Sequence, residues 1–169
     1  MTPAQIYSHF VLSRQVTAME RREVLELLGK TGHTLNLYTN DKNTEIPGWK
    51  NNGPVDYYDK MPEVFANSRI NLNITLRSIK TGIPLRAFDI MGSGGFLLSN
   101  YQPELFEFFT PGEDLVVYES MDDLLAKVDY YLSHENERAE IAQNGCRKVL
   151  KEHTLSKRLD CMEEIALKA

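Results

Sequence analysis

Apolar positions along the chain switch repeatedly between two spacings, one typical of strands and one typical of helices. Segments in which apolar and polar residues alternate, and short continuous apolar runs, predict strands. The predicted strands are residues 33–39, 55–58, 69–75, 96–99 and 115–118. The first two are separated by a stretch rich in Asn, Asp, Lys, Gly and Pro, residues 40–54. This composition predicts a loop long enough to have a function.

Helices are predicted in the intervening segments, where apolar residues recur at three- and four-residue spacing. An N-terminal helix is expected over about residues 2–29, because residues 2–5, Thr-Pro-Ala-Gln, have the pattern of a capping box with proline in the first turn. A C-terminal helix is expected over about residues 154–168, and Ser133 is expected to cap the helix before it. The remaining predicted helices are residues 61–67, 85–92, 103–109 and 121–132.

The alternation of strands and helices predicts an α/β fold, with a parallel sheet between two layers of helices. The length of 169 residues favours one domain, residues 1–169. In sheets of this kind, ligands bind at the carboxyl ends of the strands. The loops expected to form a binding site therefore follow Thr39, Thr75, Ser99 and Tyr118.

Composition narrows the classes of partner. The formal net charge of −5 argues against a nucleic-acid or anionic-membrane binder, but it is compatible with a small anionic ligand. The two cysteines, Cys146 and Cys161, form no C-x-x-C pair and no zinc-ligand spacing occurs, so no metal is expected. No apolar run has the length of a membrane span, and the N-terminus lacks the pattern of a signal peptide. We therefore expect a cytoplasmic protein.

Candidate chemistry is concentrated in residues 73–92, where a predicted strand ends, a basic loop follows and a helix begins after a proline. The free N–H groups and the dipole at a helix N-terminus favour an anion. Arg77, Lys80 and Arg86 add positive charge, and Gly82 would let a ligand approach the backbone closely. This segment therefore predicts a phosphate or diphosphate site.

Asp89 lies one turn into the same predicted helix, on the side of Arg86. A carboxylate close to a diphosphate could accept hydrogen bonds from both hydroxyls of a ribose. The alternative is an ion pair between Arg86 and Asp89 on a solvated face. The spacing leaves both alternatives open. Tyr57 lies where a nucleobase could stack.

Other chemical motifs are absent or structural. The glycines of residues 92–95 follow a predicted helix and precede a strand, so they indicate a helix C-cap and a tight turn rather than a phosphate-binding loop. No G-x-S-x-G, H-E-x-x-H or D-x-D motif occurs, and the catalytic residues stay unknown. His153, near Arg158, is more typical of packing at a helix end than of catalysis.

The run of residues 82–99 resembles the signature of GT-B glycosyltransferases, E-G-(F)-x-P-x-x-x-E-A-M-A-x-G-x-P-V in the retaining members. Similar segments follow in the family's order at residues 103–105, 111–115 and 153–159. Together these segments look most like the C-terminal domain of group 1 glycosyltransferases (family 4-like), of the CgeB spore-maturation type.

The resemblance implies a Rossmann-like domain, the donor-binding half of a GT-B fold. Such a domain binds a nucleotide-diphosphate sugar, usually a uridine diphosphate sugar, without a metal or other cofactor. Asp89 takes the place of the family glutamate that contacts the ribose hydroxyls. The implied donor-site residues are Arg77, Lys80, Thr81, Gly82, Ile83, Pro84, Leu85, Arg86 and Asp89, with Val55 and Tyr57 at the nucleobase.

Two departures from the family pattern affect the expected function. Thr81 stands where the first glutamate of the motif is expected. A GT-B enzyme also has its active site between two Rossmann-like domains, and the N-terminal acceptor-binding domain is expected to be missing from this chain. We therefore expect the isolated chain to be inactive. The alternative is a non-catalytic interaction module of a spore coat or surface assembly that kept the half-fold.

Overall fold

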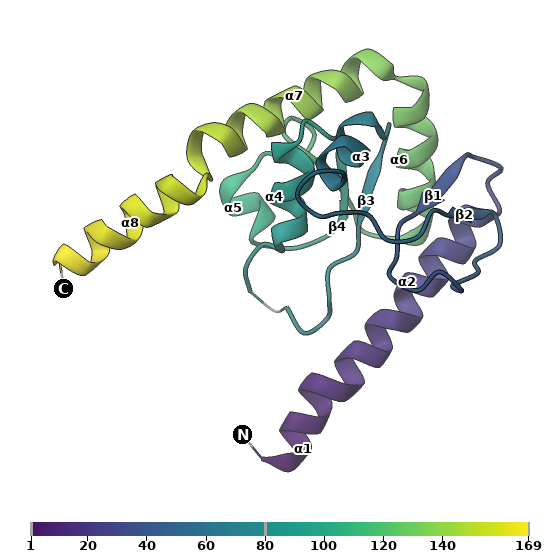
Figure 1. The fold of residues 1–169 in the computed structure, drawn as a ribbon, viewed down its shortest axis with the longest axis horizontal. Helices are drawn as coiled ribbons and strands as arrows, with labels where there is room; N and C mark the ends of the chain where they lie inside the picture. Colours follow the sequence, from purple (N-terminus) through teal and green to yellow (C-terminus); the bar gives the residue numbers. More distant parts are fainter. Residues whose placement is uncertain (1, 80, 169) are drawn as a thin grey trace.

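The computed structural model describes residues 2–79 and 81–168, and every strand that it describes is parallel to its neighbour (Figure 1). One sheet has the order β3-β4-β5, and β1 and β2 form a separate pair. The strands are β1 (Leu35–Leu37), β2 (Trp49–Asn51), β3 (Asn71–Asn73), β4 (Leu97–Asn100) and β5 (Val116–Tyr118). The helices are α1 (Pro3–Ile6), the π-helix η1 (Tyr7–Leu12), α2 (Ser13–Gly29), α3 (Met61–Asn67), α4 (Leu85–Gly92), α5 (Leu105–Phe108), α6 (Met121–Ser133), α7 (Glu135–Glu152) and α8 (Leu155–Lys168).

Two apolar cores lie on opposite faces of the three-stranded sheet. Leu98 and Val116 belong to the α2/α6 core, with side chains of α2, α6 and the first half of α7. Their neighbours Leu97 and Val117 belong to the α3/α4 core, with side chains of α3, α4, α5 and the end of α7. Because successive side chains of a strand point to opposite faces, the apolar runs of β4 and β5 serve both cores. The predicted fold class, α/β with helices flanking a parallel sheet, is confirmed.

The predicted loop at residues 40–54 contains a strand. β2 pairs with β1 in parallel, with Leu35 opposite Trp49. The Trp49 indole N–H donates to the carbonyl of Leu25 in α2, at 2.7 Å, and the ring packs against the α2/α6 core. The tertiary contacts of this one large side chain therefore stabilise a strand. The polar residues around it predict only a loop.

The prediction of a strand at residues 55–58 is wrong. One carboxylate oxygen of Asp56 accepts the backbone N–H groups of Tyr58, at 2.9 Å, and Asp59, at 2.7 Å. The Asp56 carbonyl accepts those of Lys60 and Met61. These local bonds use the donors that a strand ladder would need, so the segment forms a turn that leads into α3.

Ser133 does not cap the helix that follows it. Its hydroxyl donates backwards to the carbonyls of Asp129, at 2.8 Å, and Tyr130, at 2.9 Å. Ser133 is therefore the last residue of α6, and α7 begins after His134 without a side-chain cap. A serine at a junction between two helices can form hydrogen bonds with backbone groups of either helix. Its sequence position does not decide between them.

The glycines after α4 form a Schellman C-cap, as their position after a helix predicts. Gly94 has a φ of +79°, and its N–H donates to the carbonyl of Met91. The N–H of Gly95 donates to the carbonyl of Ile90. A Cβ on Gly95 would lie 2.7 Å from the side-chain nitrogen of Asn71, so this turn brings α4 directly against β3.

The helical segments at the two ends of the chain extend away from the α/β body (Figure 1). The expected capping box forms at the N-terminus, where Thr2 and Gln5 exchange side-chain to backbone hydrogen bonds. The far parts of both segments expose apolar side chains. These are Ile6, Tyr7, Phe10, Val11, Leu12, Val16 and Met19 at the N-terminus and Leu155, Leu159, Met162, Ile165 and Leu167 in α8.

His153 joins α7 and α8 through an aromatic cluster. Its ring lies 5.5, 5.6 and 5.1 Å from the rings of Phe88, Phe108 and Phe109. Its Nδ1 accepts a hydrogen bond from Arg158, and its Nε2 is buried with no hydrogen-bond partner among the described residues. These contacts agree with the packing role expected from the sequence.

Protonation of His153 should destabilise the fold. Burial lowers the pKa of His153 below its ordinary value of 6.5. The positive charges of Arg158 and Lys148 lower it further, and Glu152 opposes them. The unfolded chain therefore binds this proton more readily than the folded one, so the free energy of unfolding falls as pH decreases below about 6.5. Urea unfolding at pH 7.5 and 5.5 measures this effect. The free energy of unfolding should decrease less between the two pH values for His153→Gln than for the wild type. Equal losses in the two proteins would contradict the expectation.

Candidate functional site

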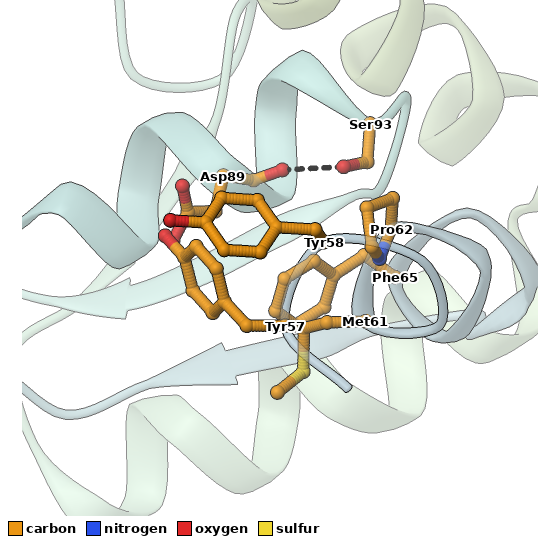
Figure 2. Close-up of a pocket in the computed structure, with 7 residues that line it drawn as sticks. All are labelled: Tyr57, Tyr58, Met61, Pro62, Phe65, Asp89 and Ser93. Atoms are coloured by element: carbon orange, nitrogen blue, oxygen red, sulfur yellow. Dashed lines mark hydrogen bonds between the residues drawn. The ribbon is translucent and has the colours of Figure 1, made fainter. Parts of the chain in front are cut away.

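Two neighbouring cavities open beside α3 and α4. The strand-end cavity, of about 420 Å³, lies at the carboxyl ends of β1 and β2 and is lined by Tyr38, Thr39, Asn40, Pro54, Val55, Tyr57, Met61 and Arg86. The helix cavity, of about 300 Å³, is lined by Tyr57, Tyr58, Met61, Pro62, Phe65, Asp89 and Ser93 (Figure 2). They share Tyr57 and Met61, so we treat them as one crevice. Its position agrees with the rule that ligands bind at the carboxyl ends of parallel strands.

Asp89 faces this crevice from α4 and is hydrogen-bonded to Tyr57. The Tyr57 hydroxyl donates to a carboxylate oxygen of Asp89 at 2.7 Å. This bond raises the pKa of Tyr57 above its ordinary value, with smaller contributions from desolvation and from the negative charge of Asp89. The Asp89 backbone carbonyl accepts the Ser93 hydroxyl, also at 2.7 Å (Figure 2). Among the described residues, the Asp89 carboxylate is hydrogen-bonded to Tyr57, and no ion pair joins it to Arg86.

Arg86 supplies positive charge to the wall of the strand-end cavity. Its guanidinium lies 5.4 Å from the ring centroid of Phe65 and 6.0 Å from that of Tyr57. Contact with two aromatic faces orients a cation without neutralising it. The crevice therefore presents a cation from the first turn of α4 and a carboxylate one turn later. Such a pair can bind an anion at one end and hydroxyl groups at the other.

Arg77 is engaged elsewhere. Its Nε lies 2.9 Å from each carboxylate oxygen of Glu20, in α2, and this contact lowers the pKa of Glu20. Its backbone N–H donates to the Thr17 hydroxyl at 3.0 Å. Both bonds fasten the segment after β3 to α2, and Arg77 lines neither cavity. Lys80, the other predicted basic residue of this loop, lies outside the described residues.

Residues 81–84 precede α4, Leu85 is its first residue, and none of these five residues lines either cavity. Gly82 has a φ of +93° and open space around it, and Thr81 is also exposed. Ile83 packs against the α3/α4 core, Pro84 is the residue before α4, and the Leu85 side chain is 77% exposed. Of the predicted donor-site residues, the structure thus brings Val55, Tyr57, Arg86 and Asp89 together at the crevice.

A family model described as glycosyl transferase-like matches residues 14–164. The chain belongs to this glycosyl transferase-like family. The match begins in α2 and ends in α8, so it includes both sheets and every residue that lines the crevice. No curated protein matches the chain.

Several crevice residues of this glycosyl transferase-like domain were not singled out from the sequence. Those after β1 and β2 come from a region where the strand-end rule did indicate a ligand, namely the loop after Thr39. Those from α3, Met61, Pro62 and Phe65, carry no chemical motif. The packing of α3 against α4 brings them to the site, because Phe65 belongs to the α3/α4 core and Met61 packs against it.

Neither a metal cluster nor a membrane helix occurs in the described parts of the glycosyl transferase-like domain. No group of three or more His, Cys, Asp and Glu side chains there could hold a metal ion. No helix there is long and apolar enough to span a bilayer.

Proposed function

We propose that this domain binds a nucleotide-diphosphate sugar, a uridine diphosphate sugar, as the donor half of a GT-B glycosyltransferase of the CgeB type. The observation that carries the proposal is the crevice at the strand ends, where Arg86 and Asp89 stand one helical turn apart. Membership of the glycosyl transferase-like family supports it independently. In this proposal the acceptor is bound by a second Rossmann-like domain, and the isolated chain is inactive.

Each part of the donor has a chemically suitable partner in the crevice. The Asp89 carboxylate accepts the ribose hydroxyls, and Val55 and the Tyr57 ring contact the base. The diphosphate lies near Arg86 and the backbone N–H groups at the start of α4. During transfer the bond between the sugar's anomeric carbon and the diphosphate oxygen breaks, and the same carbon forms a bond to the oxygen of an acceptor hydroxyl, whose proton passes to the departing diphosphate. Arg86 and the amide groups then stabilise the negative charge on the departing diphosphate.

A second candidate function, a non-catalytic interaction module of a spore coat or surface assembly, is favoured by one observation. Apolar side chains are exposed over the far parts of both terminal helical segments. Extended apolar surface of this kind is typical of contact sites between proteins. The two functions differ in the crevice, because only the first requires it to bind a nucleotide.

Asp89→Asn should weaken nucleotide binding while leaving the fold intact. We expect uridine diphosphate to bind the wild-type chain with a Kd on the order of 0.1–1 mM, since the crevice is open on one side. The variant should bind at least about tenfold more weakly, because an amide is a poorer acceptor for hydroxyl donors than a carboxylate is. Amide NMR titrations with uridine, guanosine, adenosine and thymidine diphosphates measure both affinity and base preference.

Asp160→Asn is the matched control. It also removes one carboxylate, an exposed one in α8, so it changes the net charge by the same amount as Asp89→Asn. It should bind uridine diphosphate as the wild type does. Shifts confined to residues near the crevice and lost in Asp89→Asn would support the donor site. Absence of binding by all four nucleotides at 10 mM, or equal binding by the two variants, would count against it and favour the interaction module.

A further inference from the structure

We infer that the Tyr57 hydroxyl occupies the hydroxyl-binding position at Asp89 and that a bound nucleotide must displace it. The inference rests on the proposed function, because it concerns the hydrogen-bond partner of the same carboxylate when no ligand is bound. It makes Tyr57 a residue that sets affinity, and its ring and its hydroxyl have opposite effects on binding.

The position of Tyr57 allows its hydroxyl to exchange the Asp89 carboxylate for water. It lines both cavities, and 44% of the residue is exposed, so solvent already reaches it. Its backbone belongs to the turn that Asp56 organises, which is a short connection without strand pairing. Its ring meets that of Tyr58 edge-on, with centroids 5.2 Å apart, and this neighbour is 84% exposed. The ring can therefore turn outwards without disturbing either apolar core.

The chemistry of the contact is that of a ligand hydroxyl. A phenol donates one hydrogen bond to one carboxylate oxygen, here at 2.7 Å. A ribose offers two neighbouring hydroxyls, which can donate to both oxygens of the carboxylate. Ligand binding thus exchanges one hydrogen bond within the protein for two with the ligand, while the released phenol returns to water. The bond that is broken lowers the apparent affinity by the free energy that it contributed.

Tyr57→Phe separates the hydroxyl from the ring. The variant keeps an aromatic face beside Arg86 and at the proposed base position, but it removes the competing donor. We expect uridine diphosphate to bind Tyr57→Phe about fivefold more tightly than the wild type, since a net hydrogen bond contributes about 1 kcal/mol. Tyr130→Phe is the matched control, because the Tyr130 hydroxyl also donates to a carboxylate, that of Glu137 at 2.8 Å, but lies outside the crevice. This variant should leave the Kd unchanged.

Inorganic diphosphate is the matched control ligand, because it can bind near Arg86 but carries no sugar hydroxyls. Its affinity should be the same for the wild type and Tyr57→Phe. A second measurement follows the ring carbon that carries the hydroxyl of Tyr57, whose ¹³C resonance reports on hydrogen bonding. This resonance should shift on saturation with uridine diphosphate and stay in place with inorganic diphosphate.

The outcomes distinguish this inference from the proposed function. Tighter binding of uridine diphosphate alone by Tyr57→Phe supports the inference. Equal or weaker binding by Tyr57→Phe, with Asp89→Asn still impaired, overturns the inference and leaves the donor site in place. Tighter binding of both ligands also overturns it, because the effect would then not act through hydroxyl recognition. Absence of binding by the wild type and Tyr57→Phe alike overturns the proposed function together with the inference.

Discussion

Gly145→Ala is expected to destabilise the domain by about 3 kcal/mol, the upper part of the range for overpacking a buried site. Gly145 lies in α7, where a Cβ would stand 2.3 Å from the carbonyl oxygen of Asp114 and 3.3 Å from the sulfur of Met91. Real Cβ atoms do not approach a backbone oxygen so closely. The added methyl must therefore push α7 away from the turn that contains Asp114.

That turn cannot move without losing other bonds. The buried Asp114 carboxylate accepts the Thr110 N–H at 2.9 Å and the Lys148 ammonium at 2.8 Å. The Asn144 side chain also donates to the carbonyl of Glu113 at 3.1 Å. Separation of α7 from the turn breaks the bonds from Lys148 and Asn144 together and leaves a buried carboxylate without its cation.

Gly92→Ala provides a matched control for this expectation. Gly92 is a half-buried glycine at the end of α4, next to α7, but its Cβ would only make ordinary contact with Val149, at 3.5 Å. Since alanine favours a helix over glycine by about 1 kcal/mol, this variant should be neutral or slightly stabilised. Urea unfolding followed by circular dichroism measures both changes. A Gly145→Ala variant as stable as Gly92→Ala would show that α7 can relax away from the turn.

The sequence predicts the central strands well because their signal is local. Continuous apolar runs at β4 and β5 follow directly from burial on both faces, as Leu97 and Leu98 illustrate. β2 was missed because its pairing depends on Trp49 reaching α2, which no local pattern encodes. The turn at residues 55–58 was missed because a single side chain, that of Asp56, satisfies donors that the apolar pattern assigned to a strand.

The candidate site was predicted to a similar extent. Asp89 and Arg86 are predicted at one site because helix periodicity places them one turn apart. Tyr57 is predicted near them within a strand that does not form, and the turn organised by Asp56 brings it to the crevice. The role of Arg77 could not be predicted, since its partner Glu20 lies 57 residues earlier in the chain and only the packing of α2 brings it close. Charge in a loop therefore predicts that a basic side chain is present, while its partner depends on tertiary structure.

Leu98→Ala is expected to destabilise the domain by about 2–5 kcal/mol, the range measured for buried leucines. Leu98 is fully buried in β4, the central strand of the three-stranded sheet. In register it stands between Leu72 of β3 and Val116 of β5, and all three contribute to the α2/α6 core. Truncation removes the middle of this row and leaves a cavity that neighbours held by strand pairing cannot fill.

Differential scanning calorimetry of Leu98→Ala and Leu167→Ala tests this expectation, because it compares the same substitution at a buried and at an exposed position. At a loss of about 3 kcal/mol, Tm should fall by roughly 6–12 °C in a chain of this size. Leu167, in α8, is 81% exposed, so its truncation should change stability by no more than about 0.5 kcal/mol. Similar falls in Tm for the two variants would mean that the face of α8 is buried in solution. The exposed apolar side chains of α8 would then form an interface, and the same result would strengthen the interaction-module function.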